Sequence, residues 1–389
     1  DKLEKPSTYN PLDFFQTGFN TMNSIAVSTG TETNQTHISF GAVNSEGIID
    51  NNKYNRYNFT FRNSWDIVKN VLSMNMGLFY IKQNNQNSNG QGMYYNPLVP
   101  IYLFPPSDDI NKYAVYERYD ADRNFKTQYW PYGNQGLGMQ NPYWIINRNM
   151  FNTDRDRYII SLSMKWNITN WLNIIGRARI DNAYTDFERK LYASTDGLFA
   201  KSQGNYMNQE DKNTSTYLDF LVNKKFGENY HLLVNLGGSF YDEKYKSDTF
   251  EGNLVGVPNF FHPSNIPSTE SNYNKSELHT QTQSIYGKAE IGYRNFLYAD
   301  VTGRIDWFST LVGTSKEYVC YPSAGLSVIL SEILPLPEKI ISFWKIRGSY
   351  AQVGNPPSAY LPYATVALEN GNATSANFTP ASHLKPEMT

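Results

Sequence analysis

The fold is decided by the stretch SIYGKAEIGYRNFLYADVTGRIDWF, residues 284–308. In its first half the apolar residues Ile285, Ala289 and Ile291 are separated by polar positions, and Arg294-Asn295 then interrupts the pattern. Successive side chains of a strand point to opposite faces, so this alternation predicts one apolar face and one polar face. The short interruption predicts a hairpin.

The second half of the stretch repeats the alternation, with Val301, Ile305 and Trp307 on the apolar face. The opposite face carries charges of both signs: Asp300, Arg304 and Asp306. A soluble sandwich would place these charges in bulk water, whereas a membrane barrel would place them in its lumen.

The segment around 158–166 favours the barrel, because aromatic residues bracket an aliphatic middle. The alternating apolar residues there are Tyr158, Ile160, Leu162, Met164 and Trp166. Eight residue steps of ~3.3 Å, tilted by roughly 40°, rise about 20 Å, close to the ~25 Å apolar band of a membrane-spanning strand. Tyr158 and Trp166 are therefore expected in the two interfacial girdles.

The same alternation recurs along the chain and predicts about twelve antiparallel strands. We expect them at 22–30, 36–44, 55–64, 70–82, 156–168, 170–185, 213–226, 228–245, 279–293, 295–309, 320–332 and 339–353. Mostly short connections, among them one at Gly227 and one at Pro335/Pro337, alternate with mostly long ones. Short turns at one rim and long loops at the other are typical of an outer-membrane barrel. A propeller or solenoid would show a fixed repeat, and none occurs here.

Composition narrows the class further. The chain of 389 residues has 15% aromatic and 18% charged residues, and its mean hydropathy is −0.55. No stretch approaches the roughly 18 to 20 apolar residues of a transmembrane helix. A net charge of −2 without a basic stripe gives no reason to expect a nucleic acid partner.

Nothing in the sequence indicates an enzyme or a cofactor. Cys320 is the single cysteine, so neither a disulfide framework nor a thiolate metal site is expected. The five histidines show no paired metal spacing and no Gly-x-Ser-x-Gly motif occurs. Asp108-Asp109 and Glu210-Asp211 could bind calcium, but they sit in no EF-hand-like loop and are expected to be solvated charge.

Several sequence blocks resemble the SusC-like branch of TonB-dependent outer-membrane transporters of Bacteroidetes. In chain order they are NPLDFFQTG (10–18), ISFGAVNSEGII (38–49), LYADVTGRIDWFS (297–309), YPSAGLS (321–327), KIRGSYAQVGN (345–355) and LKPE (384–387). Each block is weak alone, but their order and spacing together are specific.

The resemblance implies a Gram-negative outer-membrane barrel of about 22 strands. It also implies a lumen plug, a TonB-contacting segment and a SusD-like surface lipoprotein that closes over the barrel. We therefore expect 1–21 to lead from the plug, which this sequence lacks, into the barrel, and 22–389 to form the first part of the barrel. The long loops, expected on the extracellular side, are 83–155, 186–212, 246–278, 310–319 and 354–389.

Two sets of residues are candidates for a site. The first is aromatic, crowds the 83–155 loop and comprises Tyr94, Tyr95, Tyr129, Trp130, Tyr132, Tyr143 and Trp144. Aromatic faces of this kind either contact a sugar substrate or a lid, or pack the long loop on itself. The second set is charged and lumen-facing and comprises Arg177, Arg179, Asp181, Asp300, Arg304, Asp306, Lys345 and Arg347. These charges either line a transport path or pair with one another and with the plug.

The function expected from this reading is TonB-dependent uptake of an oligosaccharide or a peptide through a barrel that does no chemistry. An alternative is an incompletely built or structural barrel subunit held in a larger outer-membrane complex, such as the barrel-assembly machinery. Because such a barrel lies in a lipid bilayer, unpaired edge strands would have to be sealed by something else.

Overall fold

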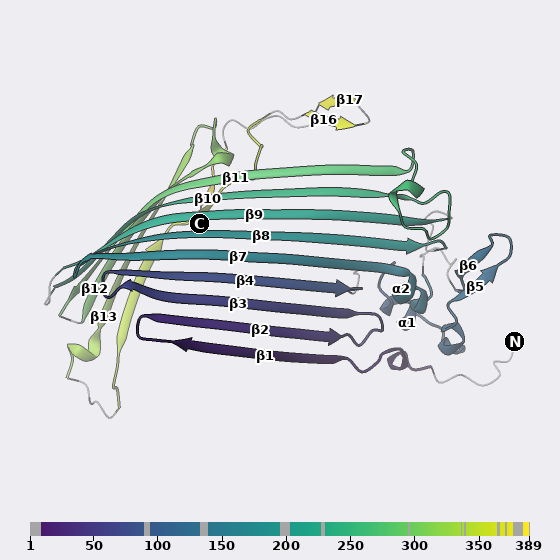
Figure 1. The fold of residues 1–389 in the computed structure, drawn as a ribbon, viewed down its shortest axis with the longest axis horizontal. Coiled ribbons are helices and arrows are strands. Elements are labelled where there is room, and N and C mark those ends of the chain that lie inside the picture. Colours follow the sequence, from purple (N-terminus) through teal and green to yellow (C-terminus); the bar gives the residue numbers. More distant parts are fainter. Residues whose placement is uncertain are drawn as a thin grey trace.

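The structure is a computed structural model that describes residues 9–88, 94–132, 139–194, 203–226, 230–294, 296–335, 337, 340–363, 366–369, 372–375 and 384–388. Twelve strands form one antiparallel sheet in which the order in space follows the order in the chain (Figure 1). They are β1 (Phe19–Gly30), β2 (Asn34–Glu46), β3 (Lys53–Val68), β4 (Leu72–Gln86), β7 (Asn149–Thr169), β8 (Leu172–Tyr192), β9 (Gly204–Phe226), β10 (Tyr230–Asn253), β11 (Ser271–Tyr293), β12 (Leu297–Phe308), β13 (Tyr318–Ile329) and β14 (Lys345–Ala351). The predicted all-β class and the twelve antiparallel strands are confirmed.

The decisive hairpin has the predicted faces. Ile285 pairs with Ile305 on one face, and Lys288 pairs with Thr302 on the other. The apolar face is open: Ile285 is 61% exposed and Val301 60%. A large apolar surface of this kind is stable where hydrocarbon covers it. No helix among the described residues has the length and apolar character needed to cross a membrane.

The strands run further into the predicted loops than the sequence suggested. β9 begins at Gly204 rather than 213, β10 ends at Asn253 rather than 245, and β11 begins at Ser271 rather than 279. A strand of 24 residues such as β10, tilted by roughly 40°, rises roughly 60 Å, more than twice the ~25 Å apolar band. The extensions are mostly polar, although Tyr206 of β9 and Phe250 of β10 pack with Leu254 and Ile266, and apolar alternation therefore did not reveal them. Cross-strand pairs such as Lys246–Glu277 (3.0 Å) join them instead.

The connection between β13 and β14 is longer than expected, because the strands end at Ile329 and restart at Lys345. A 3-10 turn, η5 (Leu330–Glu332), follows β13 directly. Pro335 and Pro337 come next, and proline has no backbone N–H to donate to a ladder. The predicted extension of the strands to 332 and back to 339 was therefore wrong. The turn predicted at Gly227 lies outside the described residues.

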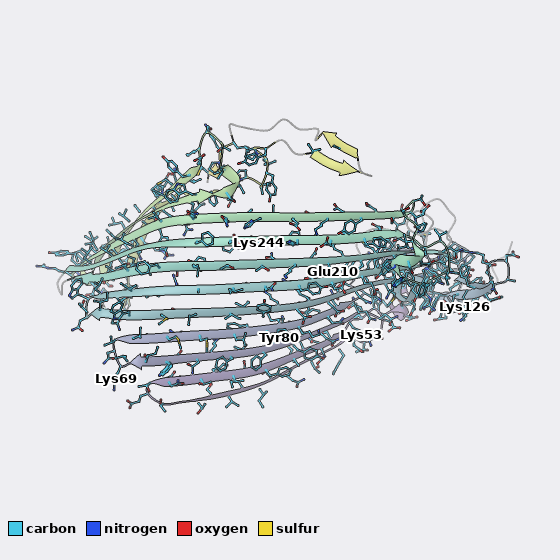
Figure 2. All side chains as sticks on the ribbon, turned by 45° about the horizontal axis from the view of Figure 1, so that its top comes forward. Lys53, Lys69, Tyr80, Lys126, Glu210 and Lys244 are labelled. Atoms are coloured by element: carbon cyan, nitrogen blue, oxygen red, sulfur yellow. The ribbon has the colours of Figure 1, made fainter. Side chains whose placement is uncertain are left out.

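The segment between β4 and β7 has a structure of its own at one end of the sheet (Figure 1). It contains α1 (Leu98–Tyr102), η2 (Ile110–Tyr113), the hairpin β5 (Glu117–Asp120) and β6 (Phe125–Gln128), and α2 (Pro142–Arg148). The smaller elements elsewhere are η1 (Pro11–Phe14), η3 (Pro263–Asn265), η4 (Ser309–Leu311), β15 (Gly354–Asn355), β16 (Val366–Glu369), β17 (Asn372–Ser375) and β18 (Glu387–Met388). Figure 2 shows side chains crowded at this end, around Lys126, while Lys69 lies at the opposite end in a short turn.

Candidate functional site

The segment between β4 and β7 is a folded unit, which we call the loop unit and define as residues 94–132 and 139–148. Its core consists of Phe104, Ile110 and Tyr113, which are at most 7% exposed. Tyr129, Trp130 and Tyr132 pack around them. The rings meet mostly edge to face, as in the Trp130–Tyr132 pair with centroids 5.3 Å apart, an arrangement that favours aromatic packing.

Asn141 ties the two halves of the loop unit together. Its buried side-chain amide donates to the backbone oxygens of Tyr113 (2.8 Å) and Tyr129 (3.0 Å). Its side-chain oxygen accepts from the backbone N–H of Tyr143 at 2.9 Å and thereby caps α2. An asparagine at the helix start thus fixes the helix against the aromatic core.

Asp108 anchors the polar edge of the same core. It accepts hydrogen bonds from the hydroxyls of Tyr113 (2.5 Å) and Tyr132 (2.6 Å) and from the ammonium of Lys112 (2.9 Å). These donors, Tyr113 first, hold the pKa of the Asp108 carboxyl well below its usual range. Among the described residues, no group of three or more potential ligands could hold a metal ion.

The segment before β1 positions the loop unit on the sheet. Phe14 of η1 packs in a buried cluster with Ile49, Ile101 and Ile146. The hydroxyl of Tyr9 donates to the backbone oxygen of Ile101 at 2.9 Å. The NPLDFF block therefore provides a packing surface for the loop unit, a role that its sequence did not reveal.

The predicted aromatic residues are mostly brought together by this packing. Trp144 is 1% exposed, and its ring meets Tyr116 edge to face. Tyr95 lies apart from the main core and packs edge to face on Phe151. The backbone oxygen of Tyr94 accepts from Gln140 at 2.9 Å. Packing of the loop on itself accounts for these positions, and contact with a substrate or a lid stays a prediction.

The charged face of the sheet contains networks that span neighbouring strands. Asp181 on β8 accepts from Nε and Nη2 of Arg157 on β7, at 2.8 and 2.6 Å, and from Nη2 of Arg179 at 2.9 Å. Arg177 on β8 makes a bidentate pair with Asp219 on β9, whose side chain is fully buried. Bidentate pairs of this kind are strong and directional.

The remaining charges of the second set are arranged differently. Arg304 donates to Asp306 at 2.6 Å and to Ser284 at 2.8 Å. Lys345 and Arg347 are exposed, and within the described part of the chain neither they nor Asp300 takes part in an ion pair. Ion pairing between neighbouring strands thus involves two of the predicted residues, Arg177 and Asp181. Arg179 and Arg304 pair instead with an acid two residues further along the same strand, Asp181 and Asp306.

Arg157 was not singled out from the sequence, nor were three arginines of the same face that make no ion pair within the described residues. They are Arg56 and Arg62 on β3 and Arg155 on β7. The alternation along β3 could have revealed two of them. Arg56 and Arg62 stand at even positions and the apolar Phe59 and Phe61 at odd positions, so the arginines point to the face opposite the phenylalanines.

Taken together, an apolar outer face, a charged inner face and antiparallel strands in chain order define the wall of a transmembrane β-barrel. A family model described as "TonB dependent receptor-like, beta-barrel" matches residues 102–389, and the chain belongs to this family. It is a family of outer-membrane transporters and receptors rather than a class of enzymes.

Solved structures show the same fold. A structure of the RagAB peptide transporter matches with a TM-score of 0.79 at 16% identity, covering 99% of this chain and 43% of that one. The ferric-catecholate import receptor Fiu of Escherichia coli K12, in a closed form, matches with a TM-score of 0.54 at 12% identity over 95% of this chain and 53% of that one. Pseudomonas aeruginosa FpvA with a bound pyoverdine matches with a TM-score of 0.55 at 12% identity, covering 89% of this chain and 42% of that one. The chain thus spans about half the length of these proteins or less. No curated protein matches its sequence.

Proposed function

We propose that the chain forms part of the wall of a TonB-dependent importer of the SusC-like branch, which takes up an oligosaccharide or a peptide across the outer membrane. The observation that carries this proposal is the continuous charged face of the sheet, with the folded loop unit at one end of it. The family match supports energised import in general, and the SusC-like sequence blocks support the branch.

In this proposal the loop unit lies on the extracellular side and the short turns on the periplasmic side. A SusD-like lipoprotein would close over the exposed edge of the loop unit, and TonB would act through other parts of the full-length protein. The hydrophobic core of the loop unit makes it rigid enough to present a fixed surface to such a lid.

Orientation is tested first, by cysteine labelling of the full-length protein in intact cells. With Cys320→Ser as background, Lys126→Cys reports the β5–β6 hairpin and Lys69→Cys reports a short turn at the other end (Figure 2). Both lysine side chains are well exposed, at 65% and 70%. A membrane-impermeant maleimide should label only Lys126→Cys. Labelling of Lys69→Cys alone would show that the short turns, and not the loop unit, lie on the extracellular side.

Transport is tested in cells that carry or lack the full-length gene. Uptake of fluorescent peptides and oligosaccharides should be lost in the deletion strain for one of these classes, and an uncoupler of the proton gradient should abolish it in cells that carry the gene. Equal uptake by both strains, or uptake that survives the uncoupler, would overturn the assignment as an energised importer.

A further inference from the structure

An excess of positive charge runs along one sector of the inner face. In the register of β3, β4, β7 and β8, Arg56, Gln83 and Arg155 lie side by side in one row. Arg62, Gly77, Ser161 and Arg179 form another row. The sector between the rows of Arg155 and Ser163 extends for eight residues, roughly 26 Å along the strands.

Few carboxylates balance these arginines. On this sector the four strands carry six arginines, Arg56, Arg62, Arg155, Arg157, Arg177 and Arg179. Asp181 is the single acid on the same sector, and Asp219 reaches it from β9. Both carboxylates are already used by Arg157, Arg177 and Arg179.

The three remaining arginines have no carboxylate partner within the described residues. The guanidinium of Arg62 lies 5.0 Å from the ring centre of Phe79 and is otherwise open. The Nε atoms of Arg56 and Arg155 are buried without a hydrogen-bond partner. No carboxylate among the described residues compensates the charge of these guanidinium groups, so they favour an anionic ligand that supplies one.

A hollow of about 530 Å³ gives an incoming group room beside these charges. Arg62, Arg177 and Arg179 line it, and its floor contains Gly77 and Ser161. Gly77 lets Ser161 approach the sheet closely, because a Cβ at position 77 would lie 2.7 Å from the hydroxyl oxygen of Ser161.

The position of the sector suits a passing cargo. Arg155 lies three residues beyond Tyr158, toward the end that carries the loop unit. Tyr158 is the predicted outer girdle residue, so Arg56 and Arg155 stand near the outer rim and the hollow at Gly77 lies deeper.

We propose that Arg56, Arg155 and the hollow at Gly77 with Arg62 form a track of binding sites for the carboxylates of an acidic peptide. Guanidinium groups recognise carboxylates through charge-assisted, paired hydrogen bonds. A peptide is favoured over an acidic saccharide because the hollow offers little free aromatic surface. Arg62 covers Phe79, and the hydroxyl of Tyr217 is held by Asp219. The proposal rests on the import function above and names its substrate class.

The test uses the purified full-length transporter and tetraglutamate as the probe, with capped tetraglutamine as the neutral counterpart and tetragalacturonate as the saccharide. Arg62→Gln, Arg155→Gln and Gly77→Val are compared with Lys126→Gln, which removes a distant exposed charge on the loop unit. Binding is measured by calorimetry at two salt concentrations. Thermal unfolding of each variant is recorded to exclude misfolding.

Wild type should bind tetraglutamate at least tenfold more tightly than tetraglutamine, with weaker binding at high salt. Each arginine variant and Gly77→Val should lose about tenfold in affinity for tetraglutamate, and Lys126→Gln should lose none. Equal affinity for both peptides overturns the proposal, as does stronger binding of tetragalacturonate. An equal loss in Lys126→Gln would assign the effect to overall charge instead.

If carboxylates from elsewhere in the full-length chain fill the track, wild type will show no preference for tetraglutamate. Arg62→Gln will then lower the thermal stability, which also overturns the assignment to cargo. Uptake of neutral nutrients by cells would persist in either case. A failure of this inference is thereby distinguishable from a failure of the import function.

Discussion

Replacing Trp144 by alanine should unfold the loop unit while leaving the barrel wall intact. The side chain belongs to α2, is 1% exposed and packs edge to face on Tyr116. Truncation of a fully buried tryptophan costs about 3 to 5 kcal/mol. The strands are held by their own backbone hydrogen bonds. The substitution should therefore lower the free energy of local unfolding of the loop unit and leave that of the strands unchanged.

The magnitude sets the expected signal. Since about 1.4 kcal/mol corresponds to a factor of ten, the open population of the loop unit should rise by about 100-fold or more. Amide hydrogen exchange of the full-length protein should show this increase across 98–102 and 142–148. Protection of β8 to β11 should not change, because local openings are separate from global unfolding.

Tyr102→Ala is the matched control, because this aromatic residue lies in the same unit but is 59% exposed. It should change exchange by less than about twofold, as surface substitutions usually do. Equal exchange in wild type and Trp144→Ala would refute the view that this tryptophan holds the loop unit. If uptake by Trp144→Ala and Trp130→Ala cells is also unchanged, the loop unit has no part in cargo binding.

Three further outcomes are expected in the full-length protein. Asp219→Asn should lower stability by about 1 to 3 kcal/mol, because its bidentate arginine partner loses a charge-assisted pair; an unchanged unfolding temperature of the SDS-resistant form would contradict this. Gly237→Ala should cost about 1 to 3 kcal/mol, since its Cβ would lie 2.7 Å from the Tyr286 ring. Gly303→Ala, where nothing lies within 4 Å, should be neutral, and equal effects of the two would refute the packing argument. Asp108, whose pKa is lowered by hydrogen bonds from two tyrosines, should stabilise the loop unit fully above pH ~4 and lose this effect as the pH falls through its folded pKa. Protection factors of the unit that stay constant down to pH 2, or that equal those of Asp108→Asn at pH 7, would contradict it.

The fold could be predicted where a strand has two unlike faces. Within the membrane band, lipid on one side and charge on the other leave a strict alternation, as at Ile285 and Lys288. Beyond that band both faces meet polar surroundings, and the extension of β10 past 245 leaves no such pattern. Backbone hydrogen bonds and cross-strand ion pairs continue the sheet there without an apolar signature.

The candidate site could be predicted in kind but not in detail. The crowding of aromatic residues indicated the loop unit. The cluster around Phe14, however, brings together segments far apart in the chain, and no local sequence pattern predicts such a contact. Charges of both signs marked the inner face. Which arginines lack an acidic partner depends on the register of neighbouring strands. Arg177 is paired with Asp219 on β9, whereas Arg155 is paired with the uncharged Thr185 on β8.

Strand order equal to chain order bears on how such a wall is made. Every strand from β2 to β14 needs only its predecessor to complete one ladder, so no strand must wait for a distant part of the chain. Loop-closure entropy then stays small at each step, apart from the long excursion between β4 and β7. That excursion folds around its own aromatic core, which removes the largest entropic barrier to stepwise addition of hairpins. Two edges then have to be protected from pairing with other chains during assembly, β1 and the strand added last.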